Sequence, residues 1–135
     1  EALKKGLLNN TIDVIVSDHT PEDPENKELE FDLASNGIIG LETTYAAVNT
    51  ACHSKIAQDQ LVEKLCHNPR KILGIEVPKI AEGQLANLTL FDPGTEWTFE
   101  RKHIQSKSRN TPFIGYKFKG KVIGIINKNE FVPSK

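Results

Sequence analysis

The fold of this chain is signalled by residues 12–21, which read Ile12-Asp13-Val14-Ile15-Val16-Ser17-Asp18-His19-Thr20-Pro21. A short β-branched apolar run bounded by polar residues is typical of a buried strand. Barrel enzymes place catalytic groups at the C-terminal ends of such strands, which is where Asp18 falls. A carboxylate held there can ligate a metal or accept a proton from a bound water. The alternative is structural, with Asp18 capping a helical turn that begins near Pro21.

Length and composition limit what this chain is by itself. Its 135 residues fall short of the ~250 that a whole (β/α)8 barrel needs, and it begins without Met, so we expect a piece of a larger protein. Charged residues make up 26% and the formal net charge is -1, which disfavours binding to nucleic acid or to an anionic membrane surface. No apolar run is long enough to span a membrane. Cys52 and Cys66 lack a CxxC pattern and no signal sequence precedes them, which favours reduced thiols in a cytoplasmic protein.

Two regions of different character follow one another along the chain. Residues 1–79 are predicted to be α/β, with a helix over 3–8, a strand over 12–17, an acidic loop over 20–36, helices over about 38–52 and 57–66, and a short helix from Asn68-Pro69 to Gly74. Residues 80–135 are predicted to be mainly β, since turn signals separate short alternating runs and a hairpin is expected to turn at Gly120. The boundary falls near residue 79.

Five short motifs occur in a fixed order. They are Ser17-Asp18-His19-Thr20-Pro21, Gly37-Ile38-Ile39-Gly40-Leu41-Glu42-Thr43, Asn68-Pro69-Arg70-Lys71-Ile72-Leu73-Gly74, Glu82-Gly83-Gln84-Leu85-Ala86-Asn87-Leu88 and Asn110-Thr111-Pro112-Phe113-Ile114-Gly115. In these motifs the chain resembles the C-terminal part of dihydroorotases of the amidohydrolase superfamily. The likeness runs over essentially the whole chain.

The resemblance implies a fold and an activity. The fold is the C-terminal fragment of a metal-dependent (β/α)8 TIM barrel, with its final strand or strands and helices in 1–79, followed by part of a small β-sandwich in 80–135. The implied activity is the reversible hydrolysis of the cyclic amide of dihydroorotate in pyrimidine biosynthesis. In that family the aspartate at the position of Asp18 contacts the metal and shuttles a proton. The backbone at Asn36 and Gly37 corresponds to the loop that approaches the substrate carboxylate, although Gly37 equally suits the entry of the chain into a helix.

One position departs from the family pattern. Active relatives usually carry a second histidine that binds the substrate's carboxylate, and Glu22 stands in its place. An anion there repels an anionic substrate. His19 does not replace the missing group, because its side chain points to the other face of an extended backbone, so we expect a structural role for it.

The metal site is incomplete in this chain. The resemblance implies one or two zinc ions, yet a catalytic zinc needs about three protein ligands plus an open position, and Asp18 is one. The other ligands are expected in a missing N-terminal barrel segment, so the isolated chain is expected to be inactive. The pairs Cys52-His53 and Cys66-His67 are interpreted as buried thiols with surface imidazoles, and His103 as part of a solvated basic patch.

Two functions from different classes remain open. The parent protein is either a dihydroorotase, or a non-catalytic dihydroorotase-like subunit that supports a partner such as aspartate transcarbamoylase. The first takes the small molecule dihydroorotate as its substrate; Glu22 favours the second. We also expect a homo-oligomer, because a barrel strand cut from its neighbours exposes apolar edges.

Overall fold

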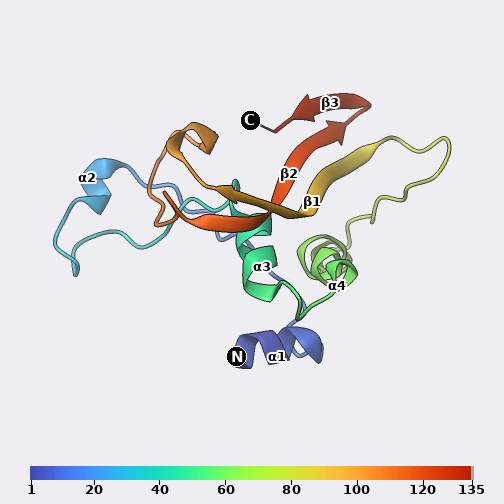
Figure 1. Ribbon diagram of the computed structural model, residues 1–135, viewed down its shortest axis with the longest axis horizontal. Helices are drawn as coiled ribbons and strands as arrows, with labels where there is room; N and C mark the ends of the chain where they lie inside the picture. The colour runs from blue at the N-terminus through green and yellow to red at the C-terminus, as the bar shows by residue number, and fades with distance from the viewer. Residues whose placement is uncertain (135) are drawn as a thin grey trace.

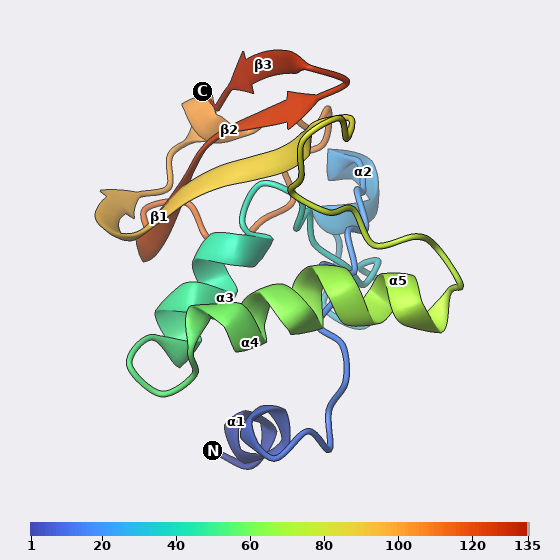
Figure 2. The same ribbon diagram turned by 90° about the vertical axis from the view of Figure 1, so that its right-hand side faces the viewer.

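The computed structural model describes residues 1–134 and places a group of helices beneath a twisted antiparallel sheet (Figure 1, Figure 2). The helices are α1 (Ala2–Leu8), α2 (Pro24–Lys27), α3 (Thr44–Cys52), α4 (Gln58–Val62), the π-helix η1 (Glu63–His67), α5 (Asn68–Ile72) and the 3-10 helix η2 (Arg101–His103). The strands are β1 (Asn87–Thr98), β2 (Lys117–Asn127) and β3 (Glu130–Pro133), in the order β1-β2-β3.

The strand predicted over 12–17 is wrong as a sheet strand. The segment is irregular, Ile15 N donates to Lys64 O at 3.1 Å, and regular pairing is limited to a parallel bridge between His19 and Ile38. A strand requires a neighbouring backbone bonded along its length, and within residues 1–134 none runs beside this segment. Apolar packing still fixes it, because Ile12 and Ile15 contact a buried cluster made of Leu7, Cys52, Ile56 and Leu61.

The helix predicted over 38–52 is shorter than expected. It begins at Thr44, and the backbone N–H groups of Thr43 and Thr44 donate to Gly40 O at 3.1 and 2.9 Å. The start lies later because Ile38 is held in the bridge to His19. Leu41, which the helical spacing assigned to an apolar stripe, is therefore in a turn and 67% exposed.

The helices predicted over 57–66 and from residue 68 are one continuous helical run, formed by α4, η1 and α5 (Figure 2). The predicted capping role of Asn68 is wrong, because Asn68 has helical dihedrals and its Nδ2 donates to Asp13 O at 3.0 Å. The α-helical segment α5 does begin at Asn68, with Pro69 in its first turn as predicted. Pro69 interrupts the α-helical bonding pattern, and the wider π turn of η1 lies directly before it. The predicted end is confirmed, since α5 stops at Ile72 and Gly74 takes a left-handed φ of 67°.

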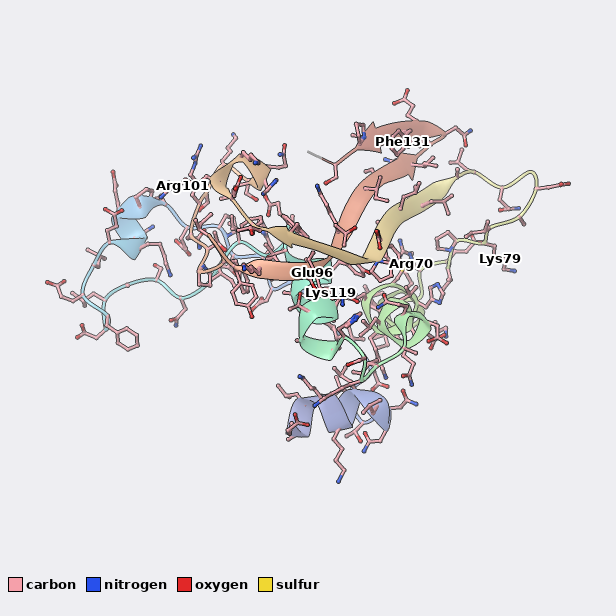
Figure 3. All side chains as sticks on the ribbon, in the orientation of Figure 1. Arg70, Lys79, Glu96, Arg101, Lys119 and Phe131 are labelled. Atoms are coloured by element: carbon pink, nitrogen blue, oxygen red, sulfur yellow. The ribbon has the colours of Figure 1, made fainter. Side chains whose placement is uncertain are left out.

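The hairpin predicted to turn at Gly120 is also wrong. β2 runs straight through Gly120, and β1 pairs with it from Asn87↔Asn127 to Thr98↔Lys117. The tight turn lies instead between β2 and β3, at Lys128 and Asn129, whose φ values of 50° and 68° suit a two-residue hairpin. This turn contains no glycine, the residue that most readily adopts a left-handed backbone. Figure 3 shows Phe131 on the outer strand β3, where it is 54% exposed.

The sheet and the helices share a second core. Ala46 of α3 packs against Phe99 and Phe118, with Trp97 and Phe113 around them. Gly120 allows this close approach, since a Cβ there would lie 2.5 Å from Asn49 Nδ2 and its φ is 97°. The strands within residues 1–134 form a single three-stranded sheet. The second sheet of the expected sandwich is therefore not part of this structure. In the same residues, the helices are too short or too polar to cross a membrane.

Candidate active site

Asp18 lies at the end of the extended segment, in a left-handed backbone conformation with a φ of 45°, and is exposed. Asp and Asn are among the few residues other than glycine that adopt this conformation readily. The helix-capping alternative for Asp18 is wrong. The nearest helix, α2, begins later and is capped by Asp23, whose Oδ1 accepts a hydrogen bond from Asn26 N at 2.9 Å.

The loop around residue 37 lies directly beside the Asp18 segment. Thr20 N donates to Ile38 O at 2.8 Å, next to the bridge between His19 and Ile38. Gly37 has a φ of 114°, and a Cβ there would lie 2.6 Å from Thr20 Cβ. Glycine is therefore needed for this close approach of two backbones. Asn36 is exposed on the same loop.

His19 has the structural role that the sequence indicated. Its Nδ1 accepts hydrogen bonds from Gly40 N at 3.0 Å and, more weakly, from Leu41 N at 3.4 Å. An imidazole nitrogen that accepts is unprotonated, so this contact uses the neutral ring. His19 therefore joins the extended segment to the loop before α3.

Glu22 continues the segment on the far side of Pro21. Its backbone N donates to Asn110 Oδ1 at 3.3 Å, and its Oε2 accepts a long hydrogen bond from Asn26 Nδ2 at 3.5 Å. The side chain is half-buried. These contacts hold the backbone and the carboxylate of Glu22 near α2.

Two side chains that hold these loops were not predicted. Lys27 Nζ donates to Ser35 O at 2.5 Å and to Gly37 O at 3.2 Å. Asn110 Nδ2 donates to the same Gly37 O at 3.2 Å and to Thr20 O at 3.0 Å. The sequence did carry one signal, because Asn110 opens the last of the five motifs. Nothing in its spacing indicated a contact across about 90 residues of chain.

The described residues do not by themselves fit a zinc centre. Residues 1–134 contain no group of three or more His, Cys, Asp or Glu side chains able to share an ion. Cys52 is buried, which raises the pKa of its thiol, whereas His53 beside it is exposed. Cys66 Sγ accepts a hydrogen bond from Arg70 Nη1 at 2.9 Å. Asp18 is therefore a single candidate ligand.

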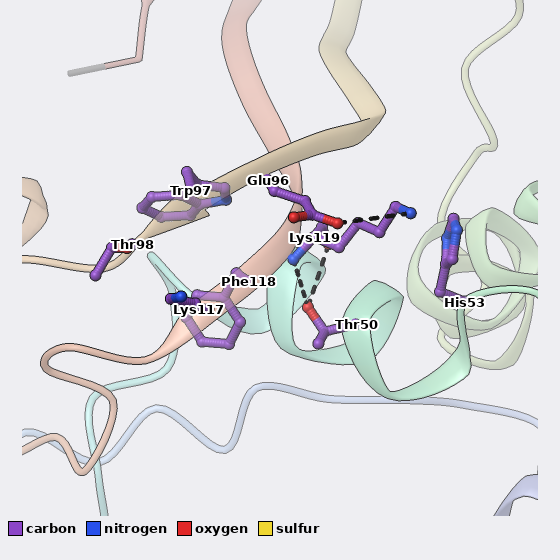
Figure 4. Close-up of a pocket in the computed structure, with 8 residues that line it drawn as sticks. All are labelled: Thr50, His53, Glu96, Trp97, Thr98, Lys117, Phe118 and Lys119. Atoms are coloured by element: carbon purple, nitrogen blue, oxygen red, sulfur yellow. Dashed lines mark hydrogen bonds and ion pairs between the residues drawn. The ribbon is translucent and has the colours of Figure 1, made fainter.

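A separate hollow lies between α3 and the sheet (Figure 4). Lys119 N donates to Thr50 Oγ1 at 2.8 Å, and Lys119 Nζ lies 3.9 Å from Glu96 Oε1. The first contact fastens α3 to the sheet, and the second joins β1 to β2. None of the residues predicted for the active site lines this hollow, so it is not the site indicated by the sequence.

The comparison with family models defines the class of protein. The model described as the amidohydrolase family matches residues 1–132. The chain belongs to the amidohydrolase family.

The individual relatives within this family include proteins named dihydroorotase. The chain is 39% identical over 133 residues to a protein named dihydroorotase from Geobacter sp. (strain M21), which covers 98% of this chain and 31% of that protein. It is 42% identical over 134 residues to a dihydroorotase of Chlorobaculum tepidum, covering 98% of this chain and 30% of that protein. The chain thus spans about a third of the length of the curated relatives it matches.

Solved structures confirm the α/β fold. L-hydantoinase (dihydropyrimidinase) from Arthrobacter aurescens aligns with a TM-score of 0.87 at 28% identity, over 98% of this chain and 31% of that one. Dihydropyrimidinase from Brevibacillus agri aligns with a TM-score of 0.86 at 27% identity, over 98% and 30%. The recognition of the family from the five motifs is therefore confirmed, and the fold is similar to that of these amidohydrolases.

Proposed function

We propose that the chain is the C-terminal part of a dihydroorotase. This enzyme reversibly hydrolyses the cyclic amide of (S)-dihydroorotate to N-carbamoyl-L-aspartate in cytoplasmic de novo pyrimidine synthesis. The observation that carries the proposal is the pairing of about 40% identity to proteins named dihydroorotase with an exposed, left-handed Asp18 at the end of its segment.

Within this proposal, Asp18 moves the proton. A carboxylate beside the reacting amide takes a proton as water attacks and returns it to the leaving nitrogen. The Asn36–Gly37 backbone, which is close to the Asp18 segment, faces the substrate's carboxylate. Residues 1–79 then belong to the end of the barrel and residues 80–135 to the sandwich. Asp18 would be the one ligand that this chain contributes to the zinc, of which the parent enzyme would hold one or two ions.

The test uses the full-length protein and the substitution Asp18→Asn. Asparagine also tolerates the left-handed backbone, so the melting temperature is expected to stay within about 2 °C of wild type. The rate of dihydroorotate hydrolysis is expected to fall about 1,000-fold, within the range that a general acid–base supplies. Asp13→Asn, a change at an exposed aspartate on the same segment, is the matched control and should keep full activity. Full activity of Asp18→Asn would refute this assignment.

A second candidate is a non-catalytic subunit that supports a partner such as aspartate transcarbamoylase. Glu22 favours it, because this carboxylate stands where active relatives bind the substrate's carboxylate. The fold also occurs in the inactive dihydroorotase-like domain of a Chaetomium thermophilum CAD-like multifunctional protein, at a TM-score of 0.64 and 16% identity, a likeness of fold alone. Zinc-supplied full-length protein that shows no turnover but co-purifies with aspartate transcarbamoylase would favour this candidate.

A further inference from the structure

We propose that Asn110 is a positioning residue that clamps the Asp18 segment to the loop around Gly37. The inference rests on the proposed function, since it assigns Asn110 a role in placing the groups of that site. It adds a contribution from the β-rich part of the chain to a site otherwise built from residues 18–37.

The amide of Asn110 contacts both loops at once. Its Nδ2 donates to Thr20 O at 3.0 Å on the first loop and to Gly37 O at 3.2 Å on the second. Its Oδ1 accepts from Glu22 N at 3.3 Å and from Ser108 Oγ at 2.5 Å. A primary amide has two N–H donors, and both are used here, while Oδ1 accepts from Glu22 N and shares the single hydroxyl proton of Ser108 with Glu22 O.

This hydrogen-bonding pattern selects asparagine. An aspartate of the same shape would keep the acceptor but would place a carboxylate oxygen against the carbonyl oxygens of Thr20 and Gly37. Alanine would leave those carbonyls and the Glu22 N–H without their partner. The side chain is half-buried, which makes water an incomplete substitute.

The segment that carries Asn110 is itself held in place. Asn110 O accepts from Ile39 N at 3.0 Å, so main chain and side chain bind the same loop. Further back, Glu42 Oε1 accepts from Ser106 N at 2.7 Å and from Gln105 N at 3.0 Å. Ser108 Oγ also donates to Glu22 O. Hydrogen bonds on both sides therefore hold the segment that carries Asn110, so the clamp does not lie on a free loop.

Asp18 lies two residues before Thr20, and its own backbone O accepts from Thr20 Oγ1 at 3.0 Å. Moving Thr20 therefore moves Asp18. A displacement of about 1 Å at a catalytic group is sufficient to lower a rate about 100-fold. Asn110 thus acts on the chemistry through Thr20 and Gly37, without touching the substrate.

The experiment compares Asn110→Ala and Asn110→Asp with wild type in the full-length protein. Both variants are expected to lower kcat/KM for dihydroorotate about 100-fold, with a fall in kcat and a rise in KM. Arg109→Ala, a change at the exposed neighbour on the same segment, should keep wild-type values. Values of kcat/KM within about twofold of wild type in folded Asn110→Ala would overturn the proposal. If Asn110→Asp behaved like wild type, only the shape of the side chain would matter, and the clamp would be wrong.

Hydrogen exchange separates this inference from the proposed function. In Asn110→Ala the amide of Glu22 loses its acceptor, Asn110 Oδ1, and is expected to exchange at least tenfold faster than in wild type, while amides in α3 keep their rates. If wild type itself hydrolyses no dihydroorotate, the proposed function fails, yet faster exchange at Glu22 would still support the clamp. Unchanged exchange at Glu22 would overturn it, whatever the activity.

Discussion

Two asparagines join the helical part of this chain to its β-rich part, and they do so in different surroundings. Asn49 of α3 is 0% exposed, and its Nδ2 donates to Lys119 O at 2.8 Å and to Pro93 O at 3.1 Å. Its Oδ1 accepts from Gln58 Nε2 at 2.5 Å. Asn110 is half-buried and binds loop backbone instead.

The two asparagines are therefore expected to act differently: Asn49 on the stability of the fold, and Asn110 on the geometry of the candidate site. Asn49 joins regular elements next to the aromatic core of Phe99 and Phe118, where an unpaired polar group has little access to water. Asn110 joins two loops that are linked by an isolated β-bridge and by the hydrogen bonds that His19 accepts, not by a regular sheet. Loss of the first amide therefore weakens the fold, whereas loss of the second moves loops whose elements stay folded.

The largest effect is expected for Asn49→Ala. The substitution leaves the half-buried carbonyl of Pro93 without this donor and Lys119 O with only the longer bond from Thr50 Oγ1, and each lost partner costs about 1–3 kcal/mol. We expect the free energy of unfolding of the full-length protein to fall by about 3 kcal/mol in urea titrations. At a temperature where the variant is folded, kcat/KM for dihydroorotate should equal that of wild type.

The control for this variant is Asn127→Ala, at an exposed asparagine on the same sheet, which should change stability by less than about 0.5 kcal/mol. An Asn49→Ala variant that keeps its stability but loses much of its kcat/KM would show that the two asparagines do not differ in this way.

The sequence predicted the features that are set by residues close together in the chain. Helical spacing located α4, and the five motifs identified the family and placed Asp18 at the end of an apolar segment. The close contact predicted between Gly37 and a substrate carboxylate stays a prediction, whereas the structure shows Gly37 with a positive φ packed closely against Thr20. The roles of Asp18, Asn36 and Glu22 in catalysis or binding stay predictions.

What the sequence did not predict depends on contacts between distant residues. Gly120 signals a turn when only its neighbours are considered, but Asn49 occupies the space beside it and β2 continues. The real turn at Lys128–Asn129 lacks glycine, and its left-handed backbone is fixed by strand pairing on both sides. Asn110 has no local pattern, because its partners lie 73–90 residues away.

Glu42→Gln tests the anchor behind the Asn110 clamp. Burial raises the pKa of Glu42, but hydrogen bonds from Ser106 and Gln105 outweigh it and leave the pKa below the usual value. A carboxyl with a lowered folded pKa stabilises the fold above its unfolded pKa, and this contribution is lost as the pH falls through the folded pKa. At pH 7 the variant is expected to lose about 2 kcal/mol of unfolding free energy, because charge-assisted bonds become neutral ones.

Urea titrations at pH 7 and at pH 3 measure the effect. The difference between wild type and Glu42→Gln should shrink at the lower pH, because the unfolded chain takes up the Glu42 proton before the folded protein does. A difference that does not change with pH would show that the charge of Glu42 does not hold the 105–106 backbone. Glu63→Gln, at an exposed glutamate on η1, is the matched control and should show little difference at either pH.

The smallest effect is expected for Glu22→His, which introduces the histidine that the resemblance to dihydroorotases predicts at this position. The backbone of Glu22 is fixed by Asn110 Oδ1 and Ser108 Oγ, so the new side chain starts from a defined position. Removing a carboxylate and adding a hydrogen-bond donor should raise kcat/KM for dihydroorotate about tenfold, equivalent to about 1.4 kcal/mol. Glu22→Gln, which removes the charge alone, should give a smaller gain.

Dihydrouracil, which lacks the carboxylate, is the control substrate and should show no gain in kcat/KM with either variant. An equal gain for dihydroorotate and dihydrouracil would contradict a role of residue 22 in carboxylate recognition.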